Sequence, residues 1–190
     1  MYRIIVAGVG GQGVLSIASI IAIAAQEEGL FFKQSEIHGM SQKKGAVSAD
    51  LIISEKDISR LGGITPTGKA DMILGMEPLE SIRHLSKLSE RGILITDSNP
   101  VTSLLNYPDE AIIYDIIKLL PNYRLVNVQE ILENVASAKM GNIALMGMAS
   151  KFLPITNERS YLKAIEKVLS NKGERIINLN TKVFQLGCKY

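Results

Sequence analysis

The stretch RIIVAGVGGQGVLSIASIIAIAAQEEG, residues 3–29, decides the expected fold. Its first part, Arg3–Ala7, is a short apolar run with the length and composition of a strand. Gly8, Gly10 and Gly13 follow, and a long apolar segment of helical character comes after them. This order predicts a strand, a tight turn whose backbone could approach a phosphate group, and a helix.

Strand-like and helix-like segments alternate along the rest of the chain, which is typical of helices packed on a mostly parallel sheet. The expected further strands are residues 30–34, 46–54, 70–76, 92–97 and 123–128. The expected further helices are residues 78–88, 107–120, 130–138, 142–152, 157–169 and 174–186. The sequence therefore predicts a single α/β domain over residues 1–190, with three α/β/α layers, a mostly parallel sheet and a helical C-terminal third.

The apolar pattern differs between the expected strands. Residues 46–54 carry Val47, Ala49, Leu51 and Ile53 on one face, as in a strand that is buried on one side. Residues 70–76 and 92–97 are instead continuous apolar runs. Such runs are typical of central parallel strands that helices cover on both faces.

Composition narrows the class of protein. Apolar residues make up 46% of the 190 residues, charged residues make up 21%, and the net charge is +2, which excludes a disordered chain and a strongly nucleic-acid-seeking one. We find no apolar run of the roughly 18 residues that a membrane helix needs, and no signal-peptide pattern at the N-terminus. We expect a cytoplasmic protein that binds neither membrane nor nucleic acid.

The single cysteine, Cys188, limits the redox chemistry of the chain. It excludes an internal disulfide and falls short of the four thiolates that usually hold an iron–sulfur cluster. We therefore predict no metal site and no cofactor bound by this chain alone, so any electron transfer must use another molecule.

The glycine turn by itself leaves two interpretations open. Backbone amides at such a turn, and those of the following helix, can bind a phosphate. A dinucleotide site also needs an acidic residue about 20 residues further on, at the end of the second strand. Glu36 falls slightly later, in the expected loop after that strand. A dinucleotide site and a purely structural turn therefore remain equal alternatives.

A polar loop, SEIHGMSQKKG at residues 35–45, is the second informative segment. Loops at the carboxyl ends of the first two strands can meet at the crevice where ligands bind, so we expect this loop to face the glycine turn. His38 could carry a proton, and Lys43 and Lys44 could meet a phosphate. An anchoring histidine and a solvated lysine pair explain the same residues, and we assign no catalytic acid, base or nucleophile.

Four segments together resemble a known family: GVGGQGVL, SEIHGMSQKKGAV, ADMILGMEPLESIR and GNIALMGMAS. They are similar to the small gamma-type subunit of 2-oxoacid:ferredoxin oxidoreductases, and most of all to its indolepyruvate branch, over nearly the whole chain. The most specific part is EIHGM followed by Gln42. The Arg-Gly-Gly that usually follows this Gln is replaced here by Lys43, Lys44 and Gly45.

The resemblance implies a subunit of an enzyme that oxidatively decarboxylates indolepyruvate, or another aryl pyruvate, to an acyl-CoA. It implies that thiamine diphosphate, Mg and iron–sulfur clusters lie on a larger partner subunit, with coenzyme A as co-substrate and ferredoxin as electron acceptor. The chain alone is then inactive. The residues that the resemblance assigns to cofactor binding or to an active-site loop are Gly8, Gly10, Gly11, Gln12, Gly13, Glu36, His38, Gly39, Met40 and Gln42.

Other functions stay open at this stage. A self-contained nicotinamide or flavin oxidoreductase, or a non-catalytic nucleotide-binding module with a Rossmann-like fold, would use the same glycine turn. The nearly continuous apolar run at residues 143–149 suits a core, and its methionines also suit an interface. Because a subunit without cofactors must contact the one that holds them, we expect an interface and, in isolation, a homodimer.

Overall fold

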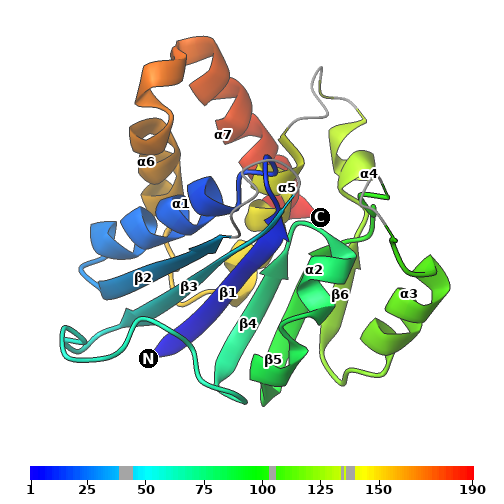
Figure 1. The fold of residues 1–190 in the computed structure, drawn as a ribbon. Coiled ribbons are helices and arrows are strands. Elements are labelled where there is room, and N and C mark those ends of the chain that lie inside the picture. The colour runs from blue at the N-terminus through cyan, green and yellow to red at the C-terminus, as the bar shows by residue number, and fades with distance from the viewer. Residues whose placement is uncertain (39–44, 103–105, 134, 136–139) are drawn as a thin grey trace.

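Six strands form one mixed sheet in the computed structural model, which describes residues 1–38, 45–102, 106–133, 135 and 140–190 (Figure 1). The strands are β1 (Tyr2–Val9), β2 (Phe31–His38), β3 (Ala46–Ser54), β4 (Ala70–Gly75), β5 (Leu88–Asp97) and β6 (Tyr123–Val126). The helices are α1 (Val14–Glu27), α2 (Pro78–Ile82), α3 (Glu110–Lys118), α4 (Val128–Leu132), α5 (Gly141–Ala149), α6 (Glu158–Val168) and α7 (Glu174–Lys189). Short 3-10 turns are η1 (Leu85–Lys87), η3 (Ser150–Phe152) and η4 (Ser170–Lys172).

The strand order is β2-β3-β1-β4-β5-β6. Strands β1, β4, β5 and β6 are parallel to one another, whereas β3 runs antiparallel to both β2 and β1. Only residues 39–45 separate β2 from β3, which is too short for the crossover that a parallel pair needs. The sheet is therefore mixed, and its parallel part is the half from β1 to β6.

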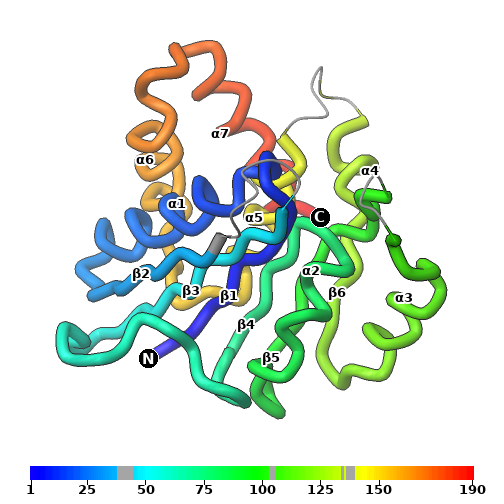
Figure 2. The backbone as a smooth tube through the Cα atoms, in the orientation of Figure 1, coloured from blue at the N-terminus to red at the C-terminus, as the bar shows by residue number. Residues whose placement is uncertain are grey.

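Alternating side chains divide the core into two layers, one on each face of the sheet. Ile4 and Val6 of β1 lie in a core with α1, α5, α6 and α7, whereas Ile5 lies in a second core with Ile113 and Ile117 of α3. Figure 2 shows the backbone in the same orientation, with α2 and α3 on the opposite side of the sheet from α5. The three α/β/α layers and the helical C-terminal third are confirmed.

The sequence led us to expect a loop over the whole polar segment 35–45. The structure instead shows the first part of this segment as strand. Ser35–His38 belong to β2, because each residue of this strand, from Phe31 to His38, pairs with β3. Glu36 consequently lies within a strand. Extended pairing with a neighbouring strand offers these residues a regular set of backbone hydrogen bonds, which a polar composition by itself does not reveal.

Strand β3 is buried on both faces from Ser48 onward, so the expectation of a half-buried strand is wrong. It lies between β2 and β1, α1 covers one face, and residues 59–65 lie over the other. On that second face the backbone N–H of Thr65 donates to the buried carboxylate of Asp50 at 2.9 Å. Lys33 of β2 also donates from Nζ to the backbone oxygen of Ser59 at 3.1 Å.

Two expected helices are shorter than the sequence suggests. Pro78 begins α2, where the expected helix 78–88 starts, and Glu77 caps it, which the sequence analysis did not predict. The helix ends at Ile82 because Leu88 enters β5 and pairs with Ala70. In the segment expected as helix 130–138, α4 ends at Leu132, and residues 136–138 lie outside the described residues. The expected helix at residues 107–120 is confirmed as α3.

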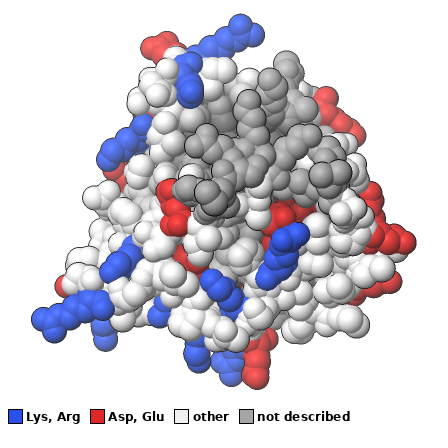
Figure 3. Space-filling model, viewed as in Figure 1, with Lys and Arg blue, Asp and Glu red and all other residues white. Residues whose placement is uncertain are grey.

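The surface carries both signs of charge. Figure 3 shows acidic side chains along the right-hand outline, in the region of α3, and basic side chains more often at the left and below.

No helix in the described part of the chain is long and apolar enough to span a bilayer. The apolar side chains of residues 143–149 are all buried, so this run belongs to the core.

We predict that Gly147→Ala destabilises the fold. A Cβ atom at Gly147 of α5 would collide with the backbone oxygen of Phe184 in α7, and backbone cannot yield as a flexible side chain can. The free energy of unfolding should fall by about 1–3 kcal/mol, the usual cost of overpacking. Urea denaturation of the variant and the parent chain measures it.

Gly62→Ala is the matched control, because a Cβ atom at Gly62 has open space around it among the described residues. It should leave the urea midpoint nearly unchanged. Equal midpoints for Gly147→Ala and the parent chain would contradict the close packing of α5 on α7.

Candidate functional site

A cavity of about 730 Å³ opens at the carboxyl ends of the parallel strands, and we call it the edge cavity. Its walls come from the segments that follow β1, β4, β5 and β6, together with α4 and the start of α5. In Figure 1 the carboxyl ends of these strands point toward α4 and α5. The lining residues are Gly11, Gln12, Gly13, Met76, Asp97, Asn99, Val128, Gln129, Leu132, Val135, Gly141, Asn142 and Leu145.

The position of the edge cavity follows from the topology. After β1 the chain turns into α1 on one face of the sheet, and after β4 it turns into α2 on the opposite face. Connections that leave neighbouring parallel strands toward opposite faces open a crevice between them. The edge cavity therefore occupies the place where ligands bind in open α/β sheets.

The side-chain amide of Gln12 holds this end of the sheet together. Its Oε1 accepts from the backbone N–H of Val9 at 2.7 Å, and its Nε2 donates to the backbone oxygen of Met76 at 2.9 Å. The backbone N–H of Gln12 also donates to the oxygen of Val9 at 3.0 Å. These bonds join the turn after β1 to the end of β4.

The glycine turn is less open to a phosphate than its spacing suggests. The N–H groups of Val9 and Gln12 are used within the turn, and the N–H of Gly10 donates to the backbone oxygen of Gly45 at 2.8 Å. A Cβ atom at Gly8 would lie 2.8 Å from Oε1 of Gln12 and 2.9 Å from Cβ of Met76. Close packing thus accounts for Gly8, and no ligand is needed to explain it.

The amino end of α1 is the part that faces the edge cavity. Gly13 precedes α1 with φ 78°, a left-handed conformation that favours glycine, and it gives the helix no side-chain cap within the described structure. The first amides of a helix have no partner within the helix and carry a partial positive charge. Asn142 lies directly beside Gly13: its Nδ2 occupies the space that a Cβ atom at Gly13 would need. An anion could bind at this end of the cavity.

The carboxyl group of Asp97 and the amide of Asn99 form another part of the wall, and Asn127 supports them from behind. Oδ1 of Asp97 accepts from the backbone N–H of Asn99 at 3.0 Å and from its Nδ2 at 2.8 Å. Nδ2 of Asn99 reaches Oδ1 of Asn127 at 3.2 Å. Burial raises the pKa of Asp97, although the hydrogen bonds from Asn99 act to lower it. Val128, Leu132 and Leu145 give the cavity an apolar side.

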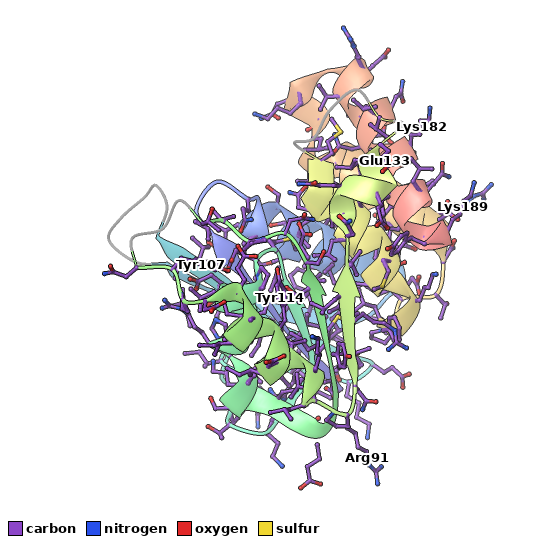
Figure 4. All side chains as sticks on the ribbon, turned by 90° about the vertical axis from the view of Figure 1, so that its right-hand side faces the viewer. Arg91, Tyr107, Tyr114, Glu133, Lys182 and Lys189 are labelled. Atoms are coloured by element: carbon purple, nitrogen blue, oxygen red, sulfur yellow. The ribbon has the colours of Figure 1, made fainter. Side chains whose placement is uncertain are left out.

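A buried glutamate supports the segment that carries Asp97 and Asn99. Oε2 of Glu77 accepts from the N–H of Glu80 at 2.8 Å, and Oε1 accepts from the hydroxyl of Tyr107 at 2.5 Å and from the N–H of Val101 at 3.3 Å. The hydroxyl of Tyr114 donates to the oxygen of Ser98 at 2.7 Å. Figure 4 labels both tyrosines, which are partly buried and pack against the core on the α3 side of the sheet.

The structure brings only part of the predicted site together. Gly11, Gln12 and Gly13 line the edge cavity, and Gly8 and Gly10 shape the turn beside it. The end of segment 35–45 does reach the turn, as expected, because the backbone oxygen of Gly45 accepts from the N–H of Gly10. We expected two neighbouring parallel strands to bring them together, whereas Gly45 directly precedes β3, which runs antiparallel to β1.

The other predicted site residues do not line the cavity or lie outside the described residues. Glu36 is exposed on β2, accepts from Nε2 of Gln34 at 3.0 Å, and is not among the described lining residues. The last residue of β2 is His38. The predictions for Gly39, Met40 and Gln42, and for the neighbouring Lys43 and Lys44, fall on residues outside the described ranges.

Sequence reasoning missed most of the cavity wall. Asp97, Asn99, Gln129 and Asn142 were not predicted, although Asp97 ends an apolar strand and Asn99 follows it closely. Polar residues directly after buried strands are the signal that could have found these two. Asn142 reaches the cavity from a helix of the C-terminal third; it does not follow a buried strand, and the only sequence signal that covers it is the family-like segment GNIALMGMAS.

Comparison with known proteins gives a family match over nearly the whole chain. The family model described as pyruvate ferredoxin/flavodoxin oxidoreductase matches residues 3–190. Indolepyruvate oxidoreductase subunit IorB of Methanothermobacter thermautotrophicus is 33% identical, and the aligned region covers 98% of this chain and 95% of that subunit.

Two solved structures have the same fold. The gamma subunit of a keto/oxoacid ferredoxin oxidoreductase from Geobacter sulfurreducens aligns with TM-score 0.70 and 27% identity, over 100% of this chain and 97% of that one. A 2-oxoglutarate:ferredoxin oxidoreductase from Magnetococcus marinus aligns with TM-score 0.75 and 18% identity, over 99% of this chain and 30% of the other. The second likeness concerns the fold alone.

We predict that Asp97→Asn changes how stability depends on pH. Because burial raises the pKa of Asp97, the native state holds this proton more tightly than the unfolded chain does. The resulting stabilisation is fully present below the unfolded pKa of about 3.9 and is lost as pH rises through the folded pKa. The amide introduced at this position cannot ionise, so the variant should gain stability relative to the parent chain as pH rises from about 4 to 7.

Thermal melting of both chains across this pH range measures the difference. Asp115→Asn, at an exposed position of α3, is the control and should show a much smaller trend. If the difference in melting temperature between the parent chain and Asp97→Asn is the same at every pH, burial does not raise the pKa of this carboxyl group.

Proposed function

The chain belongs to the pyruvate ferredoxin/flavodoxin oxidoreductase family as a small subunit of a 2-oxoacid:ferredoxin oxidoreductase, and we propose that its enzyme oxidatively decarboxylates indolepyruvate, or another aryl pyruvate, to the acyl-CoA. The observation that carries the substrate class is the end-to-end similarity to indolepyruvate oxidoreductase subunit IorB. We also propose that residues 1–190 are one gamma-type domain that works in the cytoplasm.

A self-contained dinucleotide-binding protein is not favoured. In such a protein the acidic residue that binds the ribose ends the strand next to the glycine turn. Here β3 separates β2 from β1, and Glu36 does not lie among the described residues of the edge cavity. The family match over residues 3–190 points the same way.

Among the described residues we find no side chains that fit the metal cofactors of such an enzyme. The described ranges contain no group of three or more His, Cys, Asp or Glu side chains that could hold a metal ion. The sequence contains one cysteine, and an iron–sulfur cluster usually needs four. We propose that a larger partner subunit holds thiamine diphosphate, Mg and the clusters, and that it passes electrons to ferredoxin.

The edge cavity fits a part of coenzyme A. Its volume of about 730 Å³ suits a small-molecule site, the amino end of α1 and Asn142 can meet a phosphate, and Val128, Leu132 and Leu145 can contact the pantetheine chain. The Magnetococcus marinus enzyme, which shares the fold, was solved with coenzyme A and succinyl-CoA bound. We propose that this subunit helps to bind the co-substrate and leaves the bond-breaking chemistry to its partner.

We predict that the isolated chain is folded and catalytically silent. A mixture of indolepyruvate, coenzyme A, thiamine diphosphate, Mg²⁺ and a viologen dye should give no reduction above the blank with this chain alone. Co-expression with its large subunit should yield an active complex that prefers aryl pyruvates to pyruvate and 2-oxoglutarate. Robust dye reduction by the isolated chain would overturn the subunit assignment, and a preference for 2-oxoglutarate would overturn the aryl substrate.

A second prediction concerns coenzyme A. Asn142→Asp places a carboxylate beside the amino end of α1, where it repels a phosphate. In the active complex the KM for coenzyme A should rise about tenfold, equivalent to about 1.4 kcal/mol, while the KM for the 2-oxoacid stays unchanged.

Asn178→Asp is the matched control, since Asn178 is an exposed residue of α7 and does not line the edge cavity. It should change neither KM. An Asn142→Asp complex with an unaltered KM for coenzyme A would remove the edge cavity from the binding site without affecting the family assignment.

A further inference from the structure

Strand β2 is a long sheet edge with exposed apolar side chains. It has eight residues, and within the described structure it pairs only with β3. Phe31, Phe32 and Ile37 are 47%, 38% and 45% exposed. An edge strand presents unpaired backbone N–H and C=O groups, and proteins usually blunt such an edge by shortening it or by placing charges on it.

The other edge of the sheet shows the usual protection. Strand β6 has only four residues, Tyr123–Val126, and one of them is Arg124, whose guanidinium lies 5.9 Å from the centre of the Phe152 ring. The two edges of one sheet therefore differ in length and in exposed apolar surface. We propose that two copies of this chain join through their β2 strands, which pair antiparallel about a two-fold axis at Gln34.

Two-fold symmetry restricts the registers that β2 can use. In an antiparallel pair, opposite residues point to the same face, so each residue faces a partner of the same parity in the second copy. With Gln34 opposite its own copy, Phe31 faces Ile37 and Lys33 faces Ser35. Apolar side chains then meet twice, once on each side of the axis.

Neighbouring registers are less favourable. An axis at Lys33 would place two lysines opposite each other, and an axis at Glu36 would do the same with two carboxylates, and like charges directly opposite destabilise a pair. An axis at Ser35 would set Lys33 against Ile37, and it would set Phe31 against Gly39, which has no side chain to pack on it. The register centred on Gln34 is the one among these four that pairs Phe31 with an apolar side chain and separates like charges.

The proposed interface leaves the edge cavity free. Strand β3 lies between β2 and β1, and the described cavity wall comes from the segments after β1, β4, β5 and β6 and from the C-terminal helices. Two copies joined at β2 could therefore each present an edge cavity to a larger subunit. The interface thus goes beyond the function proposed above and does not depend on the identity of the substrate.

A charge exchange tests the register. Phe31 and Ile37 face Ser54 and Ser48 within the chain, so their replacement leaves no buried apolar partner behind. Phe31→Glu and Ile37→Lys should each weaken the dimer at least about tenfold in sedimentation equilibrium. The double variant sets the introduced glutamate of one copy against the introduced lysine of the other on both sides of the axis, and its dissociation constant should return to within a few-fold of the parent value.

The control is the double variant Ile112→Lys with Leu119→Glu, which introduces the same charges at side chains of the α3 region that are 58% and 84% exposed. It should leave association unchanged. A parent chain that stays monomeric at high concentration, single variants without effect, or a double variant as weak as the singles would each overturn the proposal.

Disulfide trapping provides an independent readout on the full chain with Cys188→Ser. Gln34→Cys should give a covalent dimer under mild oxidation, because side chains opposite each other across strands lie within disulfide reach. Glu36→Cys should give none, since two such cysteines would be offset by about 14 Å along the strands. Equal cross-linking of Glu36→Cys and Gln34→Cys would overturn the register. The absence of a cross-link in Gln34→Cys would overturn it as well, and this is the result expected if only the larger subunit covers the β2 edge.

Discussion

The pair of hydrogen bonds made by the side chain of Gln12 is the interaction on which the functional end of this molecule depends. One amide group satisfies the N–H of Val9 and the oxygen of Met76, so the turn after β1 and the end of β4 cannot move independently. Because the chain leaves these two strands toward opposite faces, the same bonds hold open the crevice between them. The edge cavity is thus a consequence of how β1 and β4 are joined.

Buried carboxyl groups extend this rigid frame to the next strand. Glu77 follows Met76 directly and accepts hydrogen bonds from α2, from Val101 and from the hydroxyl of Tyr107. An unpartnered buried carboxylate would be costly, so the tyrosine and the backbone must stay in place around it. The segment that carries Asp97 and Asn99 is therefore positioned by a residue that follows the preceding parallel strand.

The antiparallel β3 separates two roles within one sheet. It moves β2 away from the parallel half, and the parallel half then carries the crevice while β2 becomes a free edge. This arrangement also explains why a glycine-rich turn of dinucleotide type does not imply a nicotinamide cofactor here. The strand that would supply the ribose-binding carboxylate is no longer next to β1.

Local patterns in the sequence were sufficient for the α/β class, the strand–turn–helix at residues 3–29 and nearly every later element, because apolar periodicity and glycine spacing act over a few residues. They were also sufficient for the family, since the matching segments run along the whole chain. The direction of β3, the end of α2 and the membership of Ser35–His38 in β2 required the tertiary structure, because strand pairing joins residues far apart in sequence. Distance along the sequence also decided which residues of the site could be predicted. Gln12 could be found because it lies within the glycine motif itself. Asp97, Asn99 and Asn142 become neighbours of that motif only when three parallel strands and a C-terminal helix meet at one edge of the sheet.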